Sequence, residues 1–275
     1  MANDSAIQDQ LRFAPVKVAR CTRPDLVRRS GYLHPLADKR SDHPFRERYG
    51  SSFLSGTKLC QHLGVAQLSR AYRGASPHQR VEQRCARLVD AGVDLFGTIG
   101  YGAATIEHIC ARAGLSKRYF YESFPDSEAL LLACYERCCN EFHDAMVIAV
   151  TEAPETIEAQ LRAALFGYFS AIDADQRGAR ITLLEVLGVS TTVDEAYAAQ
   201  FQRFASSIEA LAGDAFSAST LPKPQLDVIA QGIFGAITQI ATQWLLDHRR
   251  RPRAQLIDAT YVLVLAVLDQ LPHAR

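Results

Sequence analysis

The chain has no run of 18 or more apolar residues, and its first dozen residues contain no apolar stretch of the kind found in a secretory signal. These two absences argue against a membrane span and against export. The composition is not that of a low-complexity chain either, because 48% of the residues are hydrophobic. We therefore expect a folded cytoplasmic protein with a sizeable core.

The cysteines do not form the regular spacing of a disulfide framework, and their number, seven, is odd. A reducing compartment is the simpler assignment. Cys134, Cys138 and Cys139 lie close together, with His143 shortly after them. They are either small buried hydrophobes or a thiol-based redox sensor or weak soft-metal site. Because no complete set of His and Cys ligands is visible, we expect no metal and no cofactor.

The chain carries no net charge, with 30 Lys+Arg and 30 Asp+Glu, but the charges are unevenly distributed. Residues 1–80 hold 14 Lys+Arg against 6 Asp+Glu, and the rest of the chain has the opposite imbalance. Residues 1–75 sustain no helical or strand period, so composition predicts a disordered or loosely structured basic extension. It is either a solvated tail or an arm that contacts nucleic acid phosphates. A translation start further along, for example at Val65, is a third interpretation.

Strand-like alternation between turn dipeptides is missing, whereas helical periodicity begins abruptly at Ser76. Ser76, Pro77 and Gln79 form a helix N-terminal signature, with a capping hydroxyl, a first-turn proline and a side chain that can reach back. The pattern predicts an all-α fold of about nine helices. The expected ranges are 77–97, 105–114, 116–124, 127–150, 155–172, 178–187, 193–216, 225–248 and 254–271.

The turn between the second and third of these helices, Ala113-Gly114-Leu115-Ser116, predicts a helix-turn-helix. Gly114 permits a tight reversal, Leu115 fills the space between the helices, and Ser116 caps the helix that follows. The leading turns of that helix hold side chains that can bind phosphates or reach base edges in a major groove. These are Lys117, Arg118, Tyr119 and Tyr121.

The surrounding stretch resembles the TetR family of bacterial transcriptional regulators, in register and without gaps over residues 80–131. The residues that carry the resemblance are Leu95-Phe96, Gly100-Tyr101, Thr105-Ile106, Ile109, Ala113-Gly114-Leu115-Ser116-Lys117, Phe120-Tyr121, Phe124 and Glu128-Ala129-Leu130. The resemblance implies a helix-turn-helix DNA-binding domain over 76–126, after the extension. It also implies a helical ligand-binding and dimerisation domain over 127–275, and a regulator rather than an enzyme.

By position, the resemblance implies that Thr105 and Tyr121 contact phosphates and that Ser116 touches the DNA backbone as well as capping its helix. The groove-facing residues would be Lys117, Arg118 and Tyr119, and Ser123 completes the expected DNA-binding set. Phe120 and Phe124 are expected in the core.

Three positions depart from the common family pattern. Ala104 and Ser127 stand where many members have threonine and lysine, and Glu122 adds a negative charge to the recognition helix. Glu122 either pairs with a neighbouring arginine or accepts a hydrogen bond from a cytosine amino group. Residues 80–127 balance six Lys+Arg against six Asp+Glu, so the basic extension could supply the missing electrostatic attraction.

In this family the body holds a small ligand, and its last two long helices pair with those of a second subunit. The helix expected over 254–271 is apolar almost all round and must be buried in a core or an interface. The resemblance therefore implies a homodimer on palindromic double-stranded DNA, acting as a repressor released by a small-molecule effector. Arg249-Arg250-Arg251-Pro252-Arg253 is expected to be a solvated loop.

Aromatic side chains dominate the candidate effector pocket and favour a largely apolar effector, although such stripes often belong to a core. The candidates are Phe142, Phe166, Tyr168, Phe169, Leu184, Phe201, Phe204, Phe234 and Trp244. Two functions from other classes remain open. A helical adaptor that has lost DNA binding would explain the neutral head, whereas an enzyme finds no support in any recognisable catalytic motif.

Overall fold

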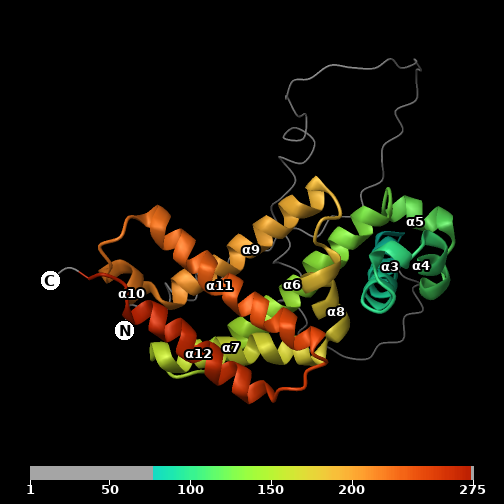
Figure 1. The fold of residues 1–275 in the computed structure, drawn as a ribbon. Helices are drawn as coiled ribbons and strands as arrows, with labels where there is room; N and C mark the ends of the chain where they lie inside the picture. The colour runs from blue at the N-terminus through green and yellow to red at the C-terminus, as the bar shows by residue number, and fades with distance from the viewer. Residues whose placement is uncertain (1–76, 274–275) are drawn as a thin grey trace, which may run out of the picture.

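The computed structural model describes residues 77–273, which fold entirely into helices, turns and loops (Figure 1). The expected all-α class is confirmed. The basic extension of residues 1–75 and the capping serine at 76 lie outside the described residues.

The three helices that come first in the described part form what we call the head. They are α3 (Pro77–Phe96), α4 (Ile106–Ala113) and α5 (Lys117–Ser123), with a short 3-10 turn, η1 (Tyr101–Ala103), between the first two. Helix α3 packs against both α4 and α5. Leu88, Phe96, Ile109 and Phe120 are fully buried where the three helices meet.

The remaining elements form what we call the body, a bundle of longer helices. They are α6 (Ser127–Thr151), α7 (Ile157–Ala174), α8 (Gln176–Arg180), a π-helical turn η2 (Ile181–Glu185), α9 (Thr191–Leu211), α10 (Gly213–Ala218), α11 (Lys223–Leu246) and α12 (Arg253–Asp269). Figure 1 shows the head at one end of the molecule and α10 and α12 at the other, with α6 running from the head into the body.

Local capping explains where several body helices begin. The side chains of Asp126, Thr156 and Ser190 each accept a hydrogen bond from the backbone N–H three residues on, at 2.8, 3.3 and 3.2 Å, and so open α6, α7 and α9. Helices α6 and α7 share the most extensive contact of the body. At that contact a Cβ on Gly167 would lie 2.5 Å from the carbonyl oxygen of Ala145, so only glycine permits this close approach.

Two predicted elements differ from the structure. The helix expected over 193–216 is two helices, α9 and α10, because the backbone leaves helical geometry at Ala212, whose φ and ψ are −95° and 20°. The helix expected over 178–187 is α8 followed by the π turn η2. Between Pro77 and His273, no helix is long and apolar enough to cross a bilayer.

Candidate nucleic-acid interface and ligand cavity

The turn between α4 and α5 has the geometry of a helix-turn-helix. Gly114 adopts the left-handed conformation, with φ 61°, and its N–H donates to the carbonyl oxygen of Ala111 at 3.2 Å. The Arg87 guanidinium, from α3, donates to the carbonyl oxygens of Ala113 and Gly114 at 2.5 and 3.3 Å. Leu115 packs partly buried against the core. These contacts fix α5 on the rest of the head.

Most of the expected DNA-binding residues are open to solvent. Thr105, Ser116, Lys117, Arg118, Tyr119 and Tyr121 are exposed, and Ser123 is half-buried. Tyr121, with 54% of its surface exposed, stands out because Phe120 and Phe124 beside it are buried. Six of the seven expected DNA-binding side chains are thus accessible to a partner, and their contact with DNA stays a prediction.

The two expected caps behave differently. Thr105 caps α4, since its Oγ1 accepts a hydrogen bond from the backbone N–H of His108 at 3.2 Å. Ser116 occupies the capping position of α5, but its hydroxyl makes no capping hydrogen bond, so that part of the prediction is wrong. With φ −82° and ψ 158°, Ser116 still turns the chain into α5 through its backbone.

The basic side chains of the recognition helix are paired with carboxylates of the head itself. Lys117 contacts Glu107 on α4, and Arg118 Nε lies 3.0 Å from Glu122 Oε1. Of the two alternatives for Glu122, the structure shows pairing with arginine, because Arg84 also lies 3.9 Å from it. Exposed ion pairs of this kind contribute little to stability because water and salt screen them, so phosphates can displace them.

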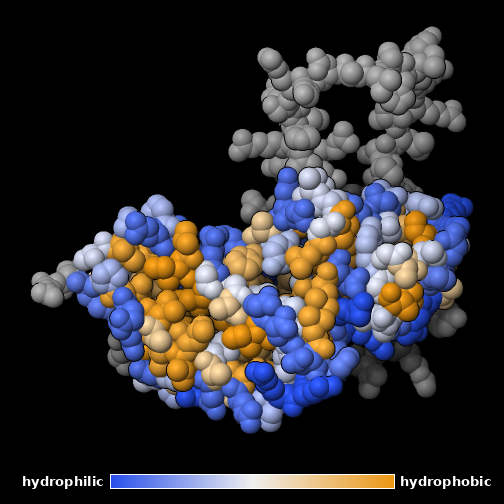
Figure 2. Space-filling model, in the orientation of Figure 1, coloured by the Kyte–Doolittle hydropathy of each residue, from blue (hydrophilic) through white to orange (hydrophobic). Residues whose placement is uncertain are grey.

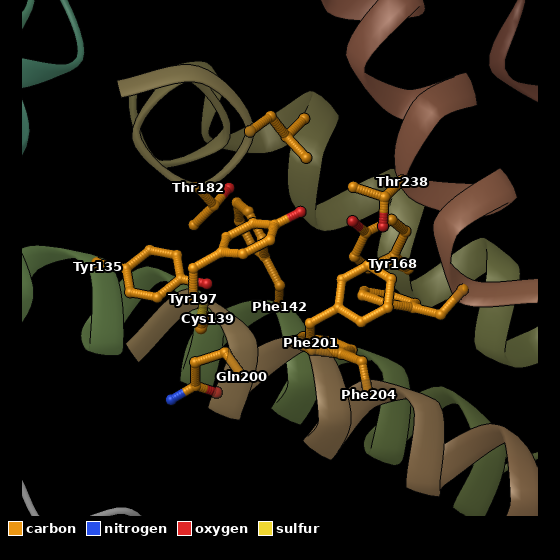
Figure 3. Close-up of a pocket in the computed structure, with 12 residues that line it drawn as sticks. Tyr135, Cys139, Phe142, Tyr168, Thr182, Tyr197, Gln200, Phe201, Phe204 and Thr238 are labelled. Atoms are coloured by element: carbon orange, nitrogen blue, oxygen red, sulfur yellow. The ribbon is translucent and has the colours of Figure 1, made fainter. Parts of the chain in front are cut away.

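A small cavity of about 30 Å³ lies in the body between α6, α7, η2, α9 and α11 (Figure 3). Figure 3 shows Tyr135, Tyr197 and Thr182 on one side of it and Tyr168, Phe201 and Thr238 on the other. The residues that line the cavity are Tyr135, Cys139, Phe142, Tyr168, Thr182, Leu183, Tyr197, Gln200, Phe201, Phe204, Phe234 and Thr238. This volume has room for one or two water molecules, so a larger ligand requires side chains to move.

Five of the nine pocket candidates from the sequence line this cavity: Phe142, Tyr168, Phe201, Phe204 and Phe234. The other four lie elsewhere. Phe169 is fully buried against Trp244, with ring centroids 6.1 Å apart. It points away from the cavity because Tyr168, its neighbour on α7, points into it. Phe166 is 53% exposed with the Arg253 guanidinium 5.3 Å above its ring, and Leu184 is half-buried in the core.

The sequence interpretation missed most of the polar lining. On α6, Tyr135, Cys139 and Phe142 follow one another at helical spacing, and Tyr197, Gln200, Phe201 and Phe204 do so on α9. These residues could have been found from the sequence by following the aromatic positions of each helix one turn further and by including side chains with a hydroxyl or an amide group. Thr182 and Thr238 carried no comparable signal.

The lining is neutral. Burial raises the pKa of the Tyr135, Tyr168 and Tyr197 hydroxyls, so all three stay protonated, and none of the described lining residues is acidic or basic. Thr238 Oγ1 is buried without a hydrogen-bond partner among the described residues. The cavity therefore suits a largely apolar group that carries one or two hydrogen-bonding atoms.

A partly buried polar network lies beside the cavity, between α6 and α9. Arg203 donates to Asn140 Oδ1 at 2.5 Å and to His143 Nδ1 at 3.2 Å, and His143 Nε2 lies 3.0 Å from Ser207 Oγ. Because the arginine donates to Nδ1, the ring proton sits on Nε2 and the imidazole is neutral. Burial, reinforced by the Arg203 charge, lowers the pKa of His143 to about 4.

The cysteines of α6 behave as small buried hydrophobes. Cys134, Cys138 and Cys139 are buried, and burial raises the pKa of each thiol, that of Cys138 to about 12. Thiols that stay protonated are poor nucleophiles and poor metal ligands. Both ring nitrogens of His143 are engaged, and no group of three or more metal-ligating side chains occurs in the described part. This geometry favours packing over redox sensing.

The loop after α11 is held to the body. Arg249 and Arg253 both contact the carboxylate of Asp173 on α7, the latter at 3.2 Å, and Trp244 Nε1 donates to the carbonyl oxygen of Arg251 at 2.9 Å. His248 and Arg249 adopt positive φ angles of 51° and 56° to make the turn. The loop expected to be solvated is therefore anchored by two of its arginines.

Comparisons with known proteins agree with this arrangement. The sequence profile of the bacterial regulatory proteins of the tetR family matches residues 88–134. The HTH-type transcriptional activator FasR of Mycolicibacterium smegmatis is 26% identical over 198 residues, which cover 70% of this chain and 87% of FasR.

Solved structures share the fold. The regulator FadR from Bacillus subtilis, in complex with stearoyl-CoA, superposes with a TM-score of 0.59 at 18% identity and covers 66% of this chain and 98% of its own. The fatty acid degradation regulator FadR from Bacillus halodurans gives 0.58 at 20% identity, over 74% of this chain and 100% of its own.

A helix-turn-helix head on an all-helical body defines a DNA-binding regulator of transcription. The match over residues 88–134 and the similarity to FasR support a regulator of the TetR family of bacterial regulatory proteins. The similar proteins are named as regulators, and the absence of an enzymatic activity in this chain stays a prediction.

Proposed function

We propose that this regulator binds a palindromic DNA operator as a homodimer and that a largely apolar acyl ligand, entering the body, releases it. The neutral aromatic cavity between five elements of the body is the observation that carries the proposal. The expectation of a repressor stays a prediction, because the similar FasR is named an activator.

An unpartnered apolar face on the last two helices supports the dimer. Figure 2 shows a broad hydrophobic surface where α11 and α12 lie. The large exposed apolar side chains of these two helices are Val228, Leu246, Val262, Leu263 and Val267. Contiguous apolar surface of this kind marks an interaction site. A two-fold pairing of these helices would bury it and present two heads, whose recognition helices could reach half-sites one DNA turn apart, about 34 Å.

The ligand class follows from the cavity and from the similar structures. The lining is aromatic and neutral, and FadR of Bacillus subtilis binds stearoyl-CoA. At about 30 Å³ the cavity admits an acyl chain only if it opens. Ligand binding thus selects an open body, and a useful switch needs a coupling of about 1–3 kcal/mol between the ligand and the DNA.

Selection from a random duplex library with the purified full chain tests both halves of the proposal. We expect enrichment of a two-fold symmetric sequence, and release of that DNA by stearoyl-CoA but not by coenzyme A alone. Enrichment of no sequence would overturn the DNA half. Enrichment without any response to acyl-CoA of several chain lengths would overturn the ligand half.

Two substitutions on the recognition helix distinguish contacts that position the protein on the DNA backbone from contacts that read the base sequence. Arg118→Ala removes a side chain that reaches base edges, so we expect about a tenfold or larger loss of affinity together with relaxed base preference at one position of each half-site. Tyr121→Phe removes only a hydroxyl that we expect to contact a phosphate, so the loss of affinity should be smaller and the same for every sequence. Equal losses with unchanged base preference for both variants would contradict this division.

A further inference from the structure

The π turn η2 joins the ligand cavity to the head. Thr182 and Leu183, on this turn, line the cavity, and Glu185 ends the same turn. Turns of π-helix are rare and occur often at functional sites. A change from π to α geometry moves the residues that follow by one register position, about 1.5 Å along the helix axis and about 100° around it. A change of this kind at η2 would therefore displace Glu185 relative to the cavity wall.

Glu185 reaches out of the body into the head. Its Oε2 accepts a hydrogen bond from the backbone N–H of Tyr101 in η1 at 2.8 Å, and its Oε1 accepts one from Arg180 Nε at 2.8 Å. Only 15% of its side chain is exposed. Gly100, with φ 89°, would bring a Cβ within 3.1 and 3.4 Å of the two carboxylate oxygens. The glycine therefore makes room for the carboxylate.

A second contact holds the same part of the body against the head. Arg177 Nη1, on α8, lies 2.6 Å from Asp94 Oδ1 near the end of α3. A Cβ on Gly97 would come within 2.4–2.8 Å of Arg177, so the two backbones touch where only glycine fits. Helix α8 and the π turn thus dock on the head independently of the covalent connection through α6.

The position of η1 sets the position of α4. Tyr101 packs its ring against Phe96, at 5.4 Å between centroids, and its hydroxyl lies 3.4 Å from Ser127 Oγ. Thr105, which begins α4 and is expected to meet a phosphate, follows four residues later. A shift of the Glu185 carboxylate would thus move Tyr101 and, four residues further on, the start of α4 at Thr105.

We infer that Glu185 is a positioning residue that holds the head in its DNA-binding orientation. Through Glu185, ligand binding in the cavity changes the orientation of the head. Opening the cavity displaces the wall formed by Thr182 and Leu183, and the same turn then withdraws the carboxylate from Tyr101. The head then loses its alignment with the operator. Glu185 itself does not line the cavity, so it takes no part in holding the ligand. The coupling part of this inference rests on the proposed ligand-dependent function.

The test compares Glu185→Ala and Glu185→Gln with the wild-type full chain and with Glu195→Ala, which removes an exposed carboxylate of α9. Operator affinity is measured with and without stearoyl-CoA, and stearoyl-CoA affinity is measured directly by calorimetry. For wild type and Glu195→Ala we expect stearoyl-CoA to weaken operator binding by about 5- to 150-fold. For Glu185→Ala we expect this factor to fall below about threefold, with stearoyl-CoA affinity unchanged within about twofold.

Glu185→Gln is expected to be intermediate, since its amide oxygen still accepts from Tyr101 whereas its NH₂ group cannot accept from Arg180. It also keeps the test valid if the alanine variant folds poorly. Full coupling in both Glu185 variants would overturn the inference. The inference would also be overturned if the Glu185 variants lost stearoyl-CoA affinity by as large a factor as they lost the effect of stearoyl-CoA on operator binding. Glu185 would then be part of the ligand site.

Hydrogen exchange separates failure of this inference from failure of the proposed function. The Tyr101 amide is expected to exchange slowly in the wild-type chain and at least about tenfold faster in Glu185→Ala, whatever the ligand. If stearoyl-CoA has no effect on wild type, the proposed ligand fails. The exchange rate of the Tyr101 amide and the operator affinity without ligand then still test whether Glu185 positions the head. If both are the same in Glu185→Ala as in the wild-type chain, Glu185 does not position the head.

Discussion

Val262→Asp is expected to convert the proposed dimer into a monomer and to lower operator affinity by at least about a hundredfold. Val262 is 63% exposed on α12, whereas Tyr261 and Val264 beside it are buried in the chain's own core. The substitution therefore leaves the fold of the single chain intact. In a two-fold interface it places two carboxylates in apolar surroundings, at a cost of several kcal/mol for each. A monomer then holds one half-site at a time.

Ile148→Asp is the matched control, since Ile148 is also a large exposed apolar side chain, 57% exposed, but lies on α6. Analytical ultracentrifugation reports the mass of both variants, and gel shifts report their affinity for a full operator and for a single half-site. A Val262→Asp protein that stays dimeric would show that α12 does not form the interface. A monomer with undiminished affinity for the full operator would show that pairing is not needed.

The sequence was sufficient for what short-range patterns determine. The left-handed Gly114, the burial of Phe120 and Phe124 and the boundaries of the longer helices agree with the structure to within a few residues. Each of these depends on neighbours three or four positions away, through helical spacing or through backbone conformation. The break at Ala212 was missed because the apolar pattern of α9 runs on into α10.

Features built from distant segments could not be predicted in the same way. The hydrogen bond between Tyr101 and Glu185 joins residues 84 positions apart, and the cavity takes its walls from five elements. The pairing of Lys117 with Glu107 depends on how α4 meets α5. Ser116 shows a further limit, since the residue type favours a cap and the backbone has the right shape, yet the hydroxyl makes no capping bond.

Acidification is expected to destabilise the body through His143. The ring is 2% exposed and its pKa is lowered to about 4, from an ordinary value of 6.5, by burial and by the Arg203 guanidinium 3.2 Å from Nδ1. Because the unfolded chain binds this proton at higher pH than the folded chain does, the free energy of unfolding falls as the pH falls from about 6.5 to about 4. Above pH 7 this group contributes no pH dependence.

The expected contribution of His143 by pH 4 is on the order of 3 kcal/mol, at 1.36 kcal/mol for each unit of pKa shift. Glu136 acts in the opposite direction, since burial raises its pKa to about 7 and the folded state therefore takes up its proton first. The total for the wild-type chain is consequently smaller than the contribution of His143. A variant that lacks only the imidazole isolates it.

His143→Gln provides that comparison, because a glutamine stays neutral over the whole range and still offers a donor and an acceptor. Denaturant unfolding of both proteins at one protein concentration, in steps from pH 7.5 to pH 4, gives the difference in unfolding free energy at each pH. The difference is expected to shift by about 3 kcal/mol in favour of the variant between pH 7 and pH 4. A constant difference would mean that the folded chain binds the His143 proton as readily as the unfolded chain does, and the burial and the Arg203 charge would then not lower the pKa of this ring.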